Sequence, residues 1–296
     1  MWGPDDVPDE TAWPDASLSH DGRWLLVHVS LGWRRTDVHL VDRTTGERRV
    51  VVEGVEAVSA FEIVGDRLYG TTTVDAPRGR VVTASTTAPH VWETIVPEGD
   101  GVIQGSAVAG DALLVASTVV AVSRLDRYRL DGGGATPVAL PAIGSLAGLD
   151  AEAERAVAFL GFESFARPPS LYRWTPDDGV VPWAAATEAI AGDDYPVEQV
   201  TYPSLDGTEV PMFLVRHRDT GPSPGTPVVL TGYAASPSPT PRRGRRWRWR
   251  WPTPAASTPW PASGAAWNTA RTGTGPGWAG ASSRSSTTSM RRRTGW

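Results

Sequence analysis

Asp21-Gly22-Arg23-Trp24-Leu25-Leu26-Val27 is a polar turn that runs directly into an apolar strand, and the sequence repeats this pattern. Copies begin at Gly65, at Gly110 and, more weakly, at Ala153, so that the starts lie 44, 45 and 43 residues apart. Self-similarity at a fixed spacing of this size is typical of a supersecondary unit that stacks against its neighbours. The repeat therefore governs the interpretation of most of the chain.

Each copy continues into a second strand that ends in a polar turn, as in the runs 37–42, 127–130 and 171–174. Gly beside Asp between apolar runs favours hairpins, because such turns need residues at positive φ. A period near 44 built only of short strands fits a four-stranded propeller blade, whereas the competing β-sandwich would not explain the period. We expect four blades, at roughly residues 12–54, 55–99, 100–142 and 143–190.

The sequence pattern changes after Gly192, where the repeat ends. The stretch EQVTYPSLDGTEVPMFLV, from Glu198 to Val215, reads as a strand, an Asp-Gly hairpin and a second strand. A loop rich in Gly and Pro follows. The apolar run 227–230 then reads as a buried strand that stops at Thr231-Gly232-Tyr233.

Composition excludes several classes of function. All 28 basic residues are Arg, and 11 of them lie after Tyr233, where there is no acid, so the first 233 residues carry 17 Arg against 33 acids. A body this acidic argues against nucleic-acid binding. No Cys is present, no apolar run is long enough to span a membrane, and the acidic start has no signal-peptide core. We therefore expect a cytoplasmic protein without cofactor, metal site or membrane partner.

The stretch 195–233 resembles the junction between propeller and α/β-hydrolase domain in the prolyl oligopeptidase family. WPDASLSHDGRWLLV, from Trp13, is similar to one of the family's middle blades, and the resemblance covers about residues 8–233. It implies a serine peptidase that cuts short peptides after proline, with a propeller that restricts access to the active site. Together with the repeat and the composition of the C-terminal residues, the resemblance gives an expected fold that is mainly β: a partial propeller of about four blades of four strands, the first strands of an α/β-hydrolase domain, and a disordered tail. The expected segments are 1–11, 12–192, 193–233 and 234–296.

The resemblance assigns one site residue, Tyr233, whose hydroxyl would donate to an oxyanion hole; from the residues alone, a strand-end Tyr packed against a loop is the alternative. The family's catalytic Ser, Asp and His all lie beyond Gly-Tyr, so none can be placed on this sequence. No serine fits the G-x-S-x-G nucleophile signature. The five histidines show no metal-ligand spacing. We therefore expect an inactive chain, and the alternative is a non-catalytic propeller that binds peptides or proteins.

Residues 234–296 use only Ala, Ser, Pro, Thr, Arg, Gly and Trp, apart from one Asn and one Met. Such a segment has no aliphatic side chains for a core, and we expect it to be disordered. The use of Arg without Lys indicates GC-rich codons, and GC-rich DNA translated in the wrong reading frame gives this amino-acid composition. Shifting the frame after Tyr233 gives a string that includes RGGVEYGEDWH, which resembles the family's hydrolase sequence. We hypothesise that one nucleotide was lost there, so the Arg/Trp patch at 242–251 and the G-x-G-x-x-G match at 275–280 are accidental, although the Arg cluster could bind polyanions non-specifically.

Overall fold

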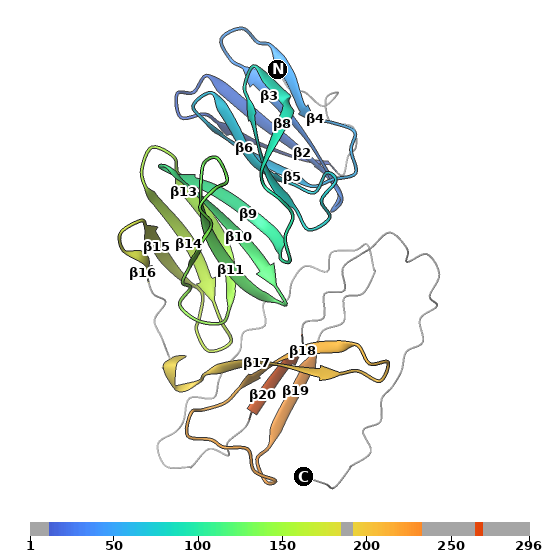
Figure 1. Ribbon diagram of the computed structural model, residues 1–296, viewed down its shortest axis with the longest axis vertical. Coiled ribbons are helices and arrows are strands. Elements are labelled where there is room, and N and C mark those ends of the chain that lie inside the picture. Colours follow the sequence, from blue (N-terminus) through green and yellow to red (C-terminus); the bar gives the residue numbers. More distant parts are fainter. Residues whose placement is uncertain (1–11, 185–191, 233–263, 269–296) are drawn as a thin grey trace.

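The computed structural model describes residues 12–184, 192–232 and 264–268. Residues 12–184 form four sheets of four antiparallel strands, and in each sheet the strand order follows the sequence. Figure 1 shows these sheets following one another along the molecule, with a fifth sheet at the end opposite the N-terminus. The mainly β fold and the four propeller blades are thereby confirmed.

The blades are numbered in chain order. Blade 1 consists of β1 (Ala12–Leu18), β2 (Trp24–Leu31), β3 (Arg35–Asp42) and β4 (Arg48–Val52). Blade 2 consists of β5 (Ser59–Val64), β6 (Arg67–Thr72), β7 (Arg80–Ser85) and β8 (Ala88–Val96). Blade 3 consists of β9 (Val102–Ala109), β10 (Ala112–Val119), β11 (Val122–Arg129) and β12 (Thr136–Val138). Blade 4 consists of β13 (Ser145–Glu152), β14 (Val157–Glu163), β15 (Ser170–Thr175) and β16 (Gly179–Ala184).

The repeated turn motif joins the first and second strands of each of the first three blades. Gly22, Gly65 and Gly110 adopt φ of +67°, +60° and +63°, the left-handed conformation that such tight turns require. The turn residues recognised in the sequence therefore set the register at which each blade begins.

The blades pack through their faces, and the alternation of side chains along each strand decides which blade is contacted. In β10, Leu113 and Val115 belong to the core between blades 2 and 3, whereas Leu114 and Ala116 belong to the core between blades 3 and 4. Successive residues of a strand point to opposite faces. A blade that is covered on both sides therefore needs an uninterrupted apolar run, as residues 112–116 provide.

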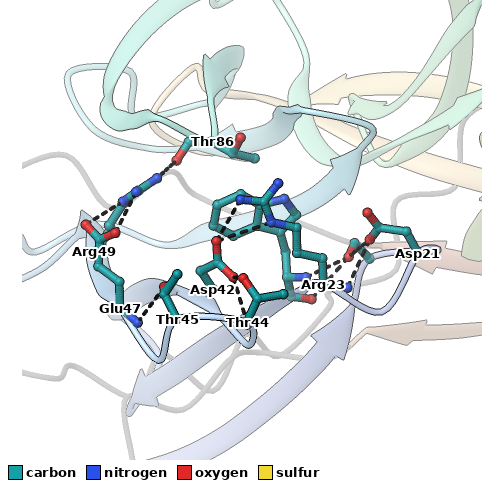
Figure 2. Close-up of polar contacts among 10 residues, drawn as sticks. Asp21, Arg23, Asp42, Thr44, Thr45, Glu47, Arg49 and Thr86 are labelled. Carbon is teal, nitrogen blue, oxygen red and sulfur yellow. Dashed lines mark hydrogen bonds and ion pairs between the residues drawn. The ribbon is translucent and has the colours of Figure 1, made fainter.

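Polar contacts tie the turns of blade 1 together at its edge (Figure 2). The buried Asp42 carboxylate accepts from Arg23 Nη2 at 2.8 Å and from the Thr44 hydroxyl at 2.6 Å. The Arg23 guanidinium, with Thr44, holds the pKa of Asp42 well below its usual range. Arg49 Nη1 donates to the Thr86 carbonyl at 2.7 Å, which links this turn to blade 2. The cluster is structural, since these contacts join the turns of blade 1 to one another and to blade 2.

A fifth sheet follows the short 3-10 turn η2 (Gly192–Asp194). Its strand order is β17 (Val197–Pro203), β18 (Glu209–Val215), β20 (Gly264–Asn268) and β19 (Val228–Gly232). The predicted strand–hairpin–strand is present, with Gly207 at φ +82°. The prediction of a buried strand at 227–230 was wrong, because Val228, Val229 and Leu230 are 66%, 59% and 58% exposed.

The predicted disordered tail also differs from the structure in one place. The backbone of Gly264–Asn268 forms β20, which runs parallel to β19 and antiparallel to β18. The other residues of 234–296 lie outside the described part of the chain.

The turn between β10 and β11 connects the propeller to the fifth sheet. Val120 and Ala121 have φ of +45° and +66°, which is unfavourable for a β-branched residue. The Gln199 side-chain amide donates to the Val120 carbonyl. A strained hairpin tip of blade 3 thus lies against β17.

Candidate functional site

Tyr233, the site residue that the sequence assigns, lies outside the described residues. The strand that leads to it, β19, ends one residue earlier at Gly232. Its role in an oxyanion hole stays a prediction.

Three histidines, to which the sequence gave no function, bind groups of the fold. His20 lies 3.1 Å from the Glu154 carboxylate, the His28 ring accepts a backbone amide at 3.0 Å, and the His217 ring accepts the Asp219 amide at 3.2 Å. Each contact is one that a structural histidine makes.

The part of the described chain best suited to binding is the place where the first strands of successive blades meet. β5 contacts β9, and β9 contacts β13. Each of these is the edge strand of its sheet, so part of its backbone polar groups has no ladder partner. Buried backbone amides of this kind need another acceptor.

A side chain from the preceding blade supplies that acceptor at each of the three junctions. His28 Nε2 accepts the Phe61 N–H of β5 at 3.0 Å. Glu62 Oε1 accepts the Val108 N–H of β9 at 3.0 Å. Ser123 Oγ accepts the Leu146 N–H of β13 at 2.9 Å. We call this set the junction acceptors; it fixes each first strand against the blade before it.

Burial controls the charge of two junction acceptors. Burial lowers the pKa of His28, an effect that the nearby Asp15 carboxylate partly opposes. The neutral ring is also what the contact with Phe61 requires, because Nε2 must accept and Nδ1 must carry the proton. Burial raises the pKa of Glu62 to about 7, with a smaller contribution from Asp150, while the Val108 amide acts in the opposite direction.

A cavity of about 220 Å³ opens beside Glu62, between β5, β9 and β13, with β6 closing one side. Its lining includes Phe61 and Tyr69, the polar side chains of Gln104 and Ser106, and the carboxylates of Glu62 and Asp150. No Arg or His is among the lining residues. The cavity therefore combines an acidic wall with an aromatic wall formed by Tyr69, because the Phe61 side chain lies on the opposite face of blade 2, in the core shared with blade 1.

Sequence reasoning missed His28 and Glu62, although one signal was available. Glu62 is the one charged residue of the run Ser59–Val64, a short strand that is otherwise apolar or small. A charge in the middle of such a strand needs a specific partner. The sequence does not show that this partner is an amide of the following blade.

Neither a metal centre nor a membrane span emerges from the described residues. In residues 12–184 and 192–232, no three His, Asp or Glu side chains lie close enough together to hold a metal ion. No helix in the described part of the chain has the length and apolar character needed to cross a bilayer.

Comparison with known proteins decides the family. The model of the prolyl oligopeptidase N-terminal β-propeller domain matches residues 6–185, more than half of the chain. The chain belongs to the prolyl oligopeptidase family. The resemblance seen in the sequence is thereby confirmed.

Curated relatives are much longer than the chain. The chain is 22% identical over 221 residues to the prolyl endopeptidase of Elizabethkingia miricola. This alignment covers 73% of the chain and 31% of the relative. It is 29% identical over 242 residues to a dual-function macrocyclase-peptidase of Amanita bisporigera, covering 76% of this chain and 33% of the relative. The chain thus spans about a third of the prolyl oligopeptidase relatives it matches.

Solved structures agree on the fold. A chain from a structural study of two prolyl endopeptidases is similar with a TM-score of 0.69 and 28% identity, over 88% of this chain and 38% of that one. Prolyl oligopeptidase B from Galerina marginata, solved with a 35mer hydrolysis and macrocyclization substrate, is similar with a TM-score of 0.63. At 20% identity over 75% of this chain and 33% of that one, the second likeness shows the fold alone.

Proposed function

We propose that the chain is the propeller portion of a serine peptidase that cleaves short peptides after proline. The observation that carries this proposal is the family match over residues 6–185, which coincides with the four blades. Residues 193–233 would begin the α/β-hydrolase domain, and Tyr233 would supply its oxyanion donor. The hairpin of β17 and β18, followed by β19, supports this, because these strands cover the stretch that resembles the family's junction between propeller and hydrolase domain.

We further propose that the chain itself is inactive. A serine peptidase needs a nucleophile, a base and an orienting acid, and the sequence contains no G-x-S-x-G nucleophile turn. The composition of residues 234–296 supports a lost nucleotide after the Tyr233 codon as the cause. Sequencing that codon in the gene tests this cause: an intact frame together with recovery of tail peptides from cells would contradict it.

Covalent labelling tests the inactivity directly. An alkyl fluorophosphonate reacts with serines that an adjacent base activates. The purified 296-residue chain should stay unlabelled under conditions in which a full-length prolyl endopeptidase is labelled to completion. Stoichiometric modification of one serine, identified by mass spectrometry, would refute the proposal.

A second candidate function is peptide binding without cleavage, and the cavity between β5, β9 and β13 favours it. Binding sites are concave and combine apolar walls with a few polar groups. This cavity does so, with side chains from three blades.

A further inference from the structure

Glu62, whose side chain is partly buried, differs from the three buried carboxylates of the propeller. Asp37 is held by Arg35 at 2.6 Å, Asp42 by Arg23 at 2.8 Å, and Asp126 by Arg124 at 2.6 Å. Glu62 has one recorded hydrogen bond, from the Val108 amide, and among the described residues no ion pair with it is found. Buried carboxylates are normally matched by a cation, because desolvation of an unpaired charge is costly.

Glu62 lines the cavity, which has room for such a cation. With about 220 Å³, the cavity has room for several waters or for one long side chain. Asp150 supplies a second carboxylate from β13, and Tyr69 of β6 lines the same space. Glu62 and Tyr69 are cross-strand partners, so their side chains lie on the same face of blade 2.

We propose that this cavity binds the guanidinium group of an arginine side chain in a peptide. A guanidinium is planar, so it can pair with a carboxylate through two parallel hydrogen bonds and stack on an aromatic ring. A compact ammonium uses the aromatic wall less well. The proposal rests on the peptide-binding candidate function and is independent of whether the chain cleaves peptides.

The binding should depend on pH in a defined direction. A bound cation favours the ionised form of Glu62, so affinity should rise as the pH increases from 6 to 8. The titratable groups around Glu62 are Asp150 from β13, the Tyr69 phenol from β6, and His28 from β2, which binds the neighbouring Phe61 amide. Burial raises the pKa of the Glu62 carboxyl to about 7, so this group changes charge over this range.

Isothermal titration of the purified chain with two matched peptides tests the proposal. The probes are acetyl-Gly-Arg-Gly-amide and its citrulline counterpart, which has nearly the same shape without the charge. At pH 8 the Arg peptide should bind about tenfold or more tightly than the citrulline peptide. Glu62→Gln should remove most of that preference while the amide oxygen still accepts from Val108. Asp150→Asn should reduce it a few-fold, and the exposed control Glu163→Gln should leave it unchanged.

Each outcome has a definite meaning. Equal binding of both peptides would overturn the guanidinium site and leave peptide binding standing. No binding of either would overturn the site, and a proline-containing peptide titrated in parallel would then decide the wider candidate function separately. A preference for Arg that survives in both Glu62→Gln and Asp150→Asn would place the site elsewhere and overturn the assignment. If Glu62→Gln failed to fold, the citrulline comparison and Asp150→Asn would still decide.

Discussion

Replacing Glu62 by Gln should stabilise the propeller at neutral and alkaline pH. In the folded chain the pKa of Glu62 is raised from 4.5 to about 7, chiefly by burial. Below pH 4.5 the carboxyl is protonated in both the folded and unfolded chains, so it adds no pH dependence. Between pH 4.5 and 7 the unfolded chain loses this proton first, and the native protein therefore loses stability as the pH rises.

The magnitude follows from the shift. At 1.36 kcal/mol for each pKa unit, the native protein loses on the order of 3 kcal/mol across this window. Glu62→Gln has no proton to lose and keeps an oxygen that accepts from the Val108 amide. The free energy of unfolding of the variant should therefore equal that of the native chain near pH 4.5. It should exceed the native value increasingly up to pH 7 and keep a constant excess above pH 7.

Urea unfolding followed by tryptophan fluorescence at pH 4.5, 6, 7 and 8 measures this difference. Glu163→Gln is the matched control, since the same substitution at an exposed site of β14 should give a difference that does not change with pH. Two results would refute the assignment of a desolvated, unpaired carboxylate at this junction. One is a variant that is less stable than the native chain at pH 8, and the other is a difference in unfolding free energy that is the same at every pH.

Three other variants test separate parts of the fold. Burial lowers the pKa of His28, so the native chain loses stability as the pH falls below 6.5. His28→Gln should remove this loss, so that the unfolding free energy of the variant depends less on pH in this range. A loss of the same size in the variant would contradict this cause. Val120→Asn combined with Ala121→Gly should raise unfolding stability by about 1 kcal/mol, because these residues accept positive φ at both turn positions; a destabilised variant would contradict the strain. Leu114→Ala, fully buried between blades 3 and 4, should cost about 2–5 kcal/mol in the same assay, and a cost below 1 kcal/mol would show that this blade interface is not packed.

The repeat could be predicted from the sequence because its causes are local. Gly22, Gly65 and Gly110 mark the turn between the first and second strands of blades 1 to 3, and alternation along the strands marks the faces. The junction acceptors could not be predicted, since the contact of Glu62 with Val108 joins residues 46 positions apart in different blades. Nothing in the spacing of either residue encodes that pairing.

In the fifth sheet, by contrast, the sequence predicts a strand correctly but not its burial. Residues 227–230 have the apolar composition of a strand covered on both faces, yet 228–230 are exposed in the structure. Local composition correctly predicts the strand, but burial depends on the neighbouring elements that pack against it. The Tyr233 assignment has the same limitation, because an oxyanion donor is defined by the groups opposite it.

Turnover of a Gly-Pro chromogenic peptide by the purified 296-residue chain is the most direct test of the account. We predict no chromophore release above the buffer blank, because the sequence contains no G-x-S-x-G nucleophile turn and so lacks a complete Ser–His–Asp triad. Release that grows in proportion to the concentration of the chain, and that a fluorophosphonate abolishes, would contradict it.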